Sequence, residues 1–319
     1  MPRIGVVGRG VVGDRIARRL PTVVRDVEVV PLDLRTQRRS VQDFDVVVLA
    51  HGGSHAPLAR VVLESGTPVV SVSDDLADVR AMVDLDVLAL ASGVPLVVGA
   101  GMSPGLTGLL ARLLVSQLAT CDEIHIALHG TAGPACARQQ HRALRGLAVG
   151  LRDGHWLQRP AGSGRELCYF PEPVGPYDCY RAELPSPVLL HEAFPEAARL
   201  SARVSANRRD RFTAWLPMLS PPHREGGIGA IRVEVRGSDE SGGRRTLIAG
   251  AAELVGTTAA ATAIAFASAA VEGRLDPGVV RAGDRSLDTV ELLRRISAVG
   301  VRLQEFTGVA SERRIRANP

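Results

Sequence analysis

Residues 4–20, IGVVGRGVVGDRIARRL, determine the architecture of the chain. Residues 4–7 are typical of a short buried strand, residues 8–13 form the pattern G-x-G-x-x-G, and residues 14–20 continue as an amphipathic helix. A strand, a glycine turn and a helix in this order are typical of a dinucleotide-binding unit. Asp33, twenty positions after Gly13, adds the acidic residue that such units carry. The alternative is an ordinary glycine-rich turn in a protein that binds no nucleotide.

Each glycine of this turn has a separate physical reason. Gly8 permits the tight bend, Gly10 lets the backbone approach a pyrophosphate, and Gly13 lets the helix lie close to its strand. The amides and dipole at the start of the helix then face the phosphates. The residues that we expect to bind the dinucleotide are Gly8, Arg9, Gly10, Val11, Val12, Gly13, Asp33, Arg35, Ala50, Gly52 and Ser73.

The rest of the first third alternates between strand and helix patterns. The expected strands are residues 27–32, 45–50, 69–73 and 95–98, and the expected helices are residues 57–65, 77–92 and 106–118. A second glycine-rich turn, GAGMSPG at residues 99–105, opens the last helix. Continuous apolar strands between helices indicate an α/β fold, with a doubly wound parallel (Rossmann) sheet over residues 1–120.

The pattern changes near Cys121, where apolar and polar residues begin to alternate. Residues 123–129, 231–235 and 246–254 are typical of strands, and Asp153-Gly154 is a hairpin signal. We therefore expect residues 121–285 to form an α+β domain with a mixed or antiparallel sheet, which binds substrate and dimerises. A C-terminal helical segment, residues 286–319, is expected to pack back on the first domain.

The composition narrows the function. The chain has 319 residues, 45% of them hydrophobic and 23% charged, as in globular proteins. All 38 basic residues are arginine, which excludes Schiff-base and P-loop lysine chemistry. Dispersed charge and 3% aromatic residues argue against nucleic-acid binding. The uncharged run 254–271 is rich in Ala and Thr and indicates a buried helix rather than a membrane span.

The cysteines and histidines give no sign of a metal site. Four cysteines without C-x-x-C spacing are expected to be reduced thiols in a cytoplasmic protein. His125 and His129 share one strand face, but no carboxylate or thiol accompanies them in the pattern of a metal site. We predict no metal, no membrane partner and no nucleic-acid partner.

Several segments together resemble one known family. They are the glycine turn, VVSVSD at residues 69–74, ASGVPLVVGAGMSPGL at 91–106, GTT at 256–258 and GVV at 278–280. Over residues 1–112 and 250–302 the chain resembles the saccharopine dehydrogenase-like family, which includes saccharopine reductases and carboxynorspermidine-type synthases. The resemblance implies a homodimeric NAD(P)-dependent oxidoreductase that transfers hydride to or from a C–N centre of an amino-acid-derived substrate.

The choice between NAD and NADP depends on one short region. Asp33 is placed to accept hydrogen bonds from ribose hydroxyls, which favours NAD. Arg9, Arg35, Arg38 and Arg39 are near it in sequence and could hold a 2′-phosphate, although Arg38 and Arg39 could equally form a solvated loop. Because arginines surround a single acid and the family includes NADPH users, we favour NADP.

Imine reduction needs a proton donor, because an iminium is a better hydride acceptor than a neutral imine. His51 and His55 follow the strand 45–50, Asp74 ends the next strand, and Tyr177 lies in a Pro-rich stretch. These four residues are the catalytic candidates. The alternatives are histidines hydrogen-bonded to their own loop and a helix-capping role for Asp74.

The substrate-binding candidates lie later in the chain. Arg208 and Arg211 could clamp carboxylates, and Thr257 and Thr258 could bind one at a helix start. The alternatives are a charged surface turn and simple helix capping. The full set of candidates is Cys168, Glu172, Arg208, Arg211, Thr257 and Thr258. Two other functions stay open: reduction of a C=O or C=C bond in a small acid, and dinucleotide sensing without turnover.

Overall fold

A parallel sheet of six strands organises the first half of the described chain, in the order β14-β5-β4-β3-β1-β2. The computed structural model describes residues 1–32, 43–219 and 221–306. The strands are β1 (Arg3–Val7), β2 (Glu28–Leu32), β3 (Val46–Leu49), β4 (Val69–Ser71), β5 (Pro95–Val98) and β14 (Gly278–Arg281). Every residue of β3, β4 and β5 is buried, as the continuous apolar runs predict.

Helices cover both faces of this sheet, so the predicted doubly wound Rossmann fold is confirmed. They are α1 (Val11–Val23), α2 (Ala56–Glu64), α3 (Leu76–Val83), α4 (Asp86–Ala91), α5 (Leu106–Val115), α9 (Val255–Val271) and α10 (Thr289–Ala298). The prediction of one helix over residues 77–92 is wrong. The chain breaks at Asp84, whose N–H bonds to the carbonyls of Arg80 and Met82. The break lets Leu85 join Met82 in the same apolar core.

A second, mixed sheet of nine strands completes the part of the fold that the structure describes. Its strands are β6 (Thr120–His129), β7 (Leu147–Arg152), β8 (His155–Pro160), β9 (Glu166–Tyr169), β10 (Pro176–Arg181), β11 (Arg199–Ser205), β12 (Ile228–Ser238), β13 (Arg244–Leu254) and β15 (Leu303–Glu305). Strands β6 and β11 run parallel, and the other pairs are antiparallel. Asp153 and Gly154 both have positive φ in the β7–β8 turn, as their sequence signal predicts.

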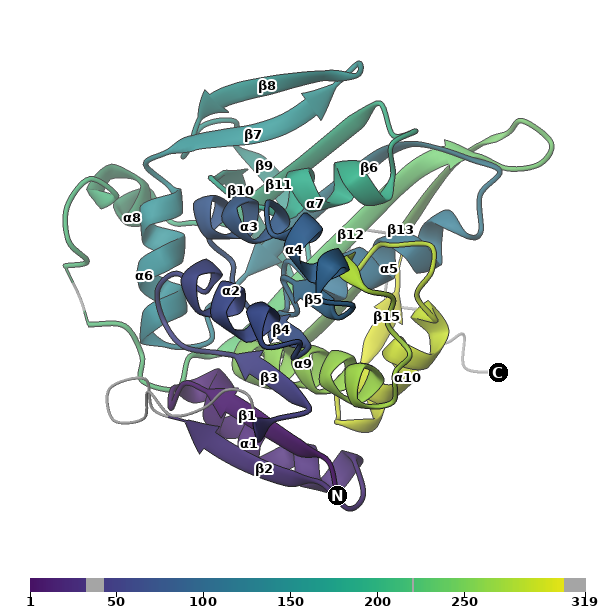
Figure 1. The fold of residues 1–319 in the computed structure, drawn as a ribbon. Helices are drawn as coiled ribbons and strands as arrows, with labels where there is room; N and C mark the ends of the chain where they lie inside the picture. Colours follow the sequence, from purple (N-terminus) through teal and green to yellow (C-terminus); the bar gives the residue numbers. More distant parts are fainter. Residues whose placement is uncertain (33–42, 220, 307–319) are drawn as a thin grey trace, which may run out of the picture.

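One apolar cluster contains residues of both sheets, such as Val48 of β3 and Ile126 of β6. Helices α6 (Pro134–Ala143), α7 (Ser186–Ala193) and α8 (Arg208–Thr213) belong to the second half. Residues 255–270 of α9 are all buried, as predicted for this Ala-rich run. Figure 1 shows α9 beside the N-terminal strands, and α9 packs on α1, α10 and β3. No helix in the described ranges has the length and apolarity needed to cross a bilayer.

The later chain returns to the first sheet. β14 pairs with β5, so residues 278–281 lie in the parallel sheet although the expected second domain, 121–285, includes them. β15 pairs with β13 of the second sheet, whereas α10 packs on α5 and α9. The division into residues 1–120, 121–285 and 286–319 stays a prediction. What the structure adds is that the strands of the two sheets interleave along the chain.

Candidate active site

A cleft of about 830 Å³ opens at the carboxyl edge of the parallel sheet. One wall consists of the turns that follow β1, β3, β4 and β5, and the opposite wall contains the first turns of α6. Val255 and Ala259, near the start of α9, also line it. Its size and its position at the ends of parallel strands are typical of small-molecule sites in α/β proteins.

The glycine turn leaves room for a phosphate group. A Cβ added to Gly8 (φ +118°) would lie 2.6 Å from backbone atoms of Ala50 and His51, and one on Gly13 would lie 2.1 Å from the Gly8 carbonyl oxygen. In contrast, a Cβ on Gly10 would meet no atom of the described chain within 4 Å. No side chain of the described residues caps the N-terminus of α1. The turn therefore fits a pyrophosphate, which would approach Gly10 and the first amides of the helix.

The structure brings most of the predicted cofactor-binding residues together at this cleft. Those that line it are Gly8, Arg9, Gly10, Val11, Val12, Ala50, Gly52 and Ser73. Gly13 is buried behind them, where α1 meets the turn. Asp33, Arg35, Arg38 and Arg39 lie outside the described residues.

His55 holds the loop after β3 in place. It is 1% exposed, and its Nε2 lies 2.9 Å from the His51 carbonyl oxygen and its Nδ1 2.7 Å from Ser71 Oγ. We assign the tautomer in which Nε2 donates and Nδ1 accepts, because the carbonyl can only accept. Burial lowers the pKa of His55 to about 4. The imidazole is therefore neutral at pH 7, with one nitrogen bonded to its own loop and the other to Ser71 of β4.

Asp78 of α3 supports the same loop. Its Oδ1 accepts hydrogen bonds from Ser54 Oγ at 2.5 Å and from the amides of His55 and Ala56 at 2.8 and 3.0 Å. These bonds hold the pKa of Asp78 below its usual value although burial opposes them. The ring of His51 lies 4.2 Å from that of His55, and burial lowers the pKa of His51 too. His51 lines the cleft.

We expect His55→Gln to flatten the acid dependence of stability. The pKa of His55 is lower in the folded protein than in the unfolded chain, so the unfolded chain binds more protons between pH 6.5 and 4. Stability should therefore fall as the pH falls, by about 3 kcal/mol from this group. Urea unfolding at pH 7, 5.5 and 4 measures it. Equal slopes for the wild type and the variant would contradict this assignment.

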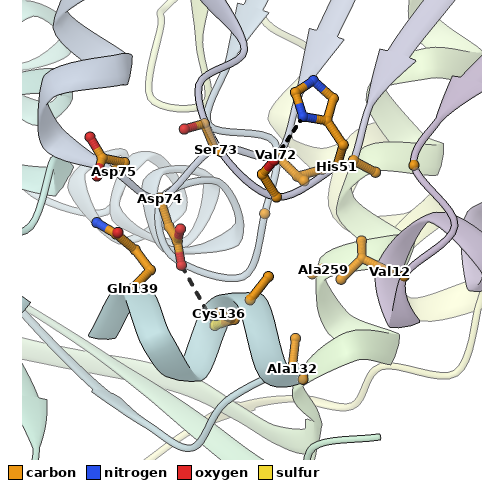
Figure 2. A pocket seen from close by; sticks show the side chains of 18 of the residues that line it. Val12, His51, Val72, Ser73, Asp74, Asp75, Ala132, Cys136, Gln139 and Ala259 are labelled. Atoms are coloured by element: carbon orange, nitrogen blue, oxygen red, sulfur yellow. Dashed lines mark hydrogen bonds between the residues drawn. The ribbon is translucent and has the colours of Figure 1, made fainter. Parts of the chain in front are cut away.

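Asp74 and Cys136 meet across the cleft (Figure 2). Asp74 follows β4, and Cys136, in the first turn of α6, donates its S–H to Asp74 Oδ2 at 3.6 Å. Burial raises the pKa of Asp74 to about 6. Burial and the nearby carboxylate raise the pKa of the Cys136 thiol far above its ordinary value. Asp74 can thus gain or lose a proton near neutral pH while the thiol stays protonated.

Asp75, rather than Asp74, caps the helix that follows. The Asp75 side chain accepts a hydrogen bond from the Asp78 amide at the start of α3. The capping role considered for Asp74 is therefore filled by its neighbour. The carboxyl group of Asp74 is left facing the cleft and α6.

Helix α6 supplies cleft residues that the sequence patterns do not single out. Cys136, Gln139 and Gln140 lie at i, i+3 and i+4, one face of the helix, and Arg142 joins them at the cleft. The Gly133-Pro134 pair is a usable helix-start signal, because proline is favoured at the first helical position. No local signal, however, shows that this helix faces the glycine turn.

Two predicted residues make contacts away from the cleft. Tyr177 of β10 is 44% exposed, and its ring lies 4.0 Å from that of His129. The guanidinium of Arg211 lies over the ring of Tyr180 at 4.0 Å, and its Nε donates to the Gly162 carbonyl at 2.8 Å. Both side chains are thus placed on the second sheet and its loops, and neither lines the cleft.

The other predicted substrate-binding residues are also outside the cleft lining. Cys168 is buried near Cys179, and Glu172 and Arg208 are exposed. Thr257 and Thr258 are buried in the first turn of α9, where the Thr258 hydroxyl donates back to the Leu254 carbonyl at 3.4 Å. Among the described residues, no three His, Cys, Asp or Glu side chains gather as metal ligands would.

Solved structures provide the comparisons for this architecture. No family model matches the sequence, and the comparison with curated proteins finds no match. Apo saccharopine dehydrogenase (L-Glu forming) from Saccharomyces cerevisiae superposes with a TM-score of 0.66 at 12% identity, covering 96% of this chain and 100% of that one. An engineered D-amino acid dehydrogenase bound to NADP⁺ gives a TM-score of 0.52 at 14% identity, covering 91% and 95%.

At these identities the likeness concerns the fold, and it extends over both sheets of this chain. Both comparison proteins are dehydrogenases by name, and one of them was solved with a nicotinamide dinucleotide. The chain thus has the fold of saccharopine dehydrogenase, and the resemblance drawn from the sequence is confirmed at the level of the fold.

Proposed function

We propose that the protein is an NAD(P)-dependent oxidoreductase that transfers hydride to or from a C–N centre of an amino-acid-derived substrate. The observation that carries this proposal is one cleft that combines two chemically different features. After β1 lies a glycine turn shaped for phosphates, and after β4 lies Asp74, a carboxyl group that titrates near neutral pH. Dehydrogenases of the same fold support the proposal.

The glycine turn would hold the dinucleotide. Gly10 and the amides of Val11 and Val12 would bind its pyrophosphate, and the turns after β4 and β5 would flank its nicotinamide half. The bound cofactor supplies the hydride. The protein's part is to align the two reacting carbons and to exclude water from between them.

Asp74 is the residue that we favour as proton donor to the substrate nitrogen. Of the four candidates, His55 is neutral with both nitrogens bonded, and Tyr177 does not line the cleft. His51 lines the cleft, but its lowered pKa disfavours the charged form that a donor needs. Asp74 is half-buried with a pKa of about 6, so a useful fraction carries a proton at neutral pH. The Cys136 thiol orients its carboxyl group.

Oxidation of NADH and NADPH with a substrate panel tests the proposal. The panel combines pyruvate, 2-oxopentanoate or 2-oxoglutarate with ammonia, methylamine, propane-1,3-diamine or L-lysine. Each component, and the enoate crotonate, is also tested alone. Turnover that needs both components supports imine reduction. Turnover with an oxo acid or enoate alone would favour C=O or C=C reduction. Cofactor binding without turnover on any member would favour a sensing role.

We expect NADP to be preferred, and Arg35→Ala to reduce that preference. Loss of a guanidinium that contacts the 2′-phosphate should raise the KM for NADPH about tenfold and leave that for NADH unchanged. Initial rates with both cofactors measure this difference. Equal losses with NADH and NADPH would show that Arg35 does not read the 2′-phosphate. The homodimer and the cytoplasmic location stay predictions.

A further inference from the structure

Outside the glycine turn, the cleft has few charged side chains that could bind a substrate. Among the described residues that line the cleft, Arg142 is the one arginine outside the glycine turn. Two lining carboxylates, Asp74 and Asp75, follow β4. The charge of Arg142 lowers the pKa of Asp74 against the effect of burial, so the two groups are within electrostatic reach.

The other titratable groups that line the cleft outside the glycine turn carry no positive charge. His51 is among them, and burial lowers its pKa, which disfavours the charged imidazolium. His55 bonds to Ser71 and to the His51 carbonyl, and Asp78 Oδ1 accepts three hydrogen bonds. The Cys136 thiol donates to Asp74. None of these groups offers a positive charge to an anionic ligand.

Arg142 lines the cleft and has N–H donors that make no hydrogen bond within the described chain. It is exposed at the end of α6, and its Nη2 donates to Gln139 Oε1 at 2.6 Å. Within the described chain its other nitrogens make no hydrogen bond, so the planar fork can bind a carboxylate. Figure 2 shows the Gln139 side chain extending from α6 toward the loop of Asp74 and Asp75.

From this charge pattern we infer that the substrate carries a single carboxylate, bound by Arg142, and that a second carboxylate is rejected. This inference rests on the proposed function and specifies its substrate. One cation can neutralise one carboxylate, and a second would face the carboxylate of Asp75 without a partner. Apolar side chains offer a surface to the remainder of the substrate. They are Val72, Ala81, Met102, Leu128, Ala135 and Ala259.

Two oxo acids of equal chain length test the inference. 2-Oxopentanoate and 2-oxoglutarate both have five carbons and differ only in the terminal group, a methyl against a carboxylate. With NAD(P)H and whichever of ammonia, methylamine and propane-1,3-diamine turns over fastest, kcat/KM should be at least tenfold higher for 2-oxopentanoate. Turnover only with L-lysine, whose imine carries a second carboxylate, would overturn the inference. Arg142→Gln should raise the KM for 2-oxopentanoate at least tenfold and change kcat less. Arg142→Lys should recover part of this loss.

Two further variants sharpen the result. Arg138→Gln is the matched control, because Arg138 is exposed on the same helix but does not line the cleft. Asp75→Asn removes a negative charge while asparagine can still cap α3, so it should narrow the preference against 2-oxoglutarate several-fold. Circular dichroism and melting temperatures verify that each variant is folded.

The outcomes separate this inference from the proposed function. Equal or better turnover of 2-oxoglutarate by the wild type would overturn the inference and leave the reductase intact. The inference would equally fail if Arg142→Gln changed the KM no more than Arg138→Gln does. No turnover of any panel member by protein that binds NADPH would refute the proposed function, and this inference with it.

Discussion

Gly10→Ala is expected to weaken the binding of NADH and NADPH at least a hundredfold without unfolding the protein. The added Cβ meets no described protein atom within 4 Å, and Gly10 has an extended backbone (φ −91°, ψ −176°) that alanine adopts freely. The methyl group therefore costs the fold less than about 1 kcal/mol, yet it occupies the space that a pyrophosphate needs. Calorimetric titration with each cofactor, beside thermal melting, measures both effects.

Gly13→Ala, unlike Gly10→Ala, is expected to destabilise the fold. Its Cβ would lie 2.1 Å from the Gly8 carbonyl oxygen, a backbone atom that cannot move without the turn. We expect this variant to lose about 1–3 kcal/mol of stability as well as cofactor binding. If Gly10→Ala still bound both cofactors with wild-type affinity, the glycine turn would not be the phosphate site.

Asp74→Asn is expected to lower kcat for imine reduction by a factor of about 10²–10⁴, the usual contribution of a general acid. The wild-type kcat should fall as the pH rises through about 6, because the protonated carboxyl group disappears over that range. The variant should lack this dependence and should bind cofactor normally, since the glycine turn is untouched. Retention of the wild-type pH profile would assign the acid elsewhere, and His51 would be the next residue to replace.

Asp74→Asn should also increase the free energy of unfolding above pH 6. The pKa of Asp74 is raised from 3.8 to about 6 in the folded protein, so the folded state binds more protons than the unfolded chain between these values. Stability from this group is therefore lost as the pH rises through that window, by up to about 3 kcal/mol. Asp74→Asn removes this pH-dependent loss of stability, because asparagine does not ionise. A variant that is more stable at pH 8 than the wild type yet inactive would separate a catalytic role from a structural one.

Local patterns predict most of the first half of the fold. The conformations of the glycine turn and of the fully apolar strands β3 and β5 can be predicted locally, because each depends on residues adjacent in sequence. The Asp153-Gly154 hairpin is another such case, since positive φ at both positions is a property of the dipeptide. The break between α3 and α4 escapes such patterns, because it serves the burial of Leu85 and carries no Gly or Pro signal.

The candidate site is harder to predict because half of it comes from packing between distant segments. Asp74 is identified from its place at a strand end, but Cys136, its partner, is 62 positions later in the chain. Arg211 and Tyr177 carry suitable chemistry, yet the second sheet directs them to Tyr180 and His129. Composition can nominate such residues, whereas only the tertiary fold decides which of them share a cavity.

The position of β14 has a consequence for how the molecule is made. This strand completes the parallel sheet beside β5, although most of the second sheet lies between the two strands in sequence. During synthesis, which runs from the N-terminus, the parallel sheet therefore keeps an unpaired edge at β5 until most of the polypeptide has left the ribosome. A fragment that ends before Gly278 would contain all three glycines of the glycine turn. It would still lack β14, the strand that pairs with β5 and completes the parallel sheet.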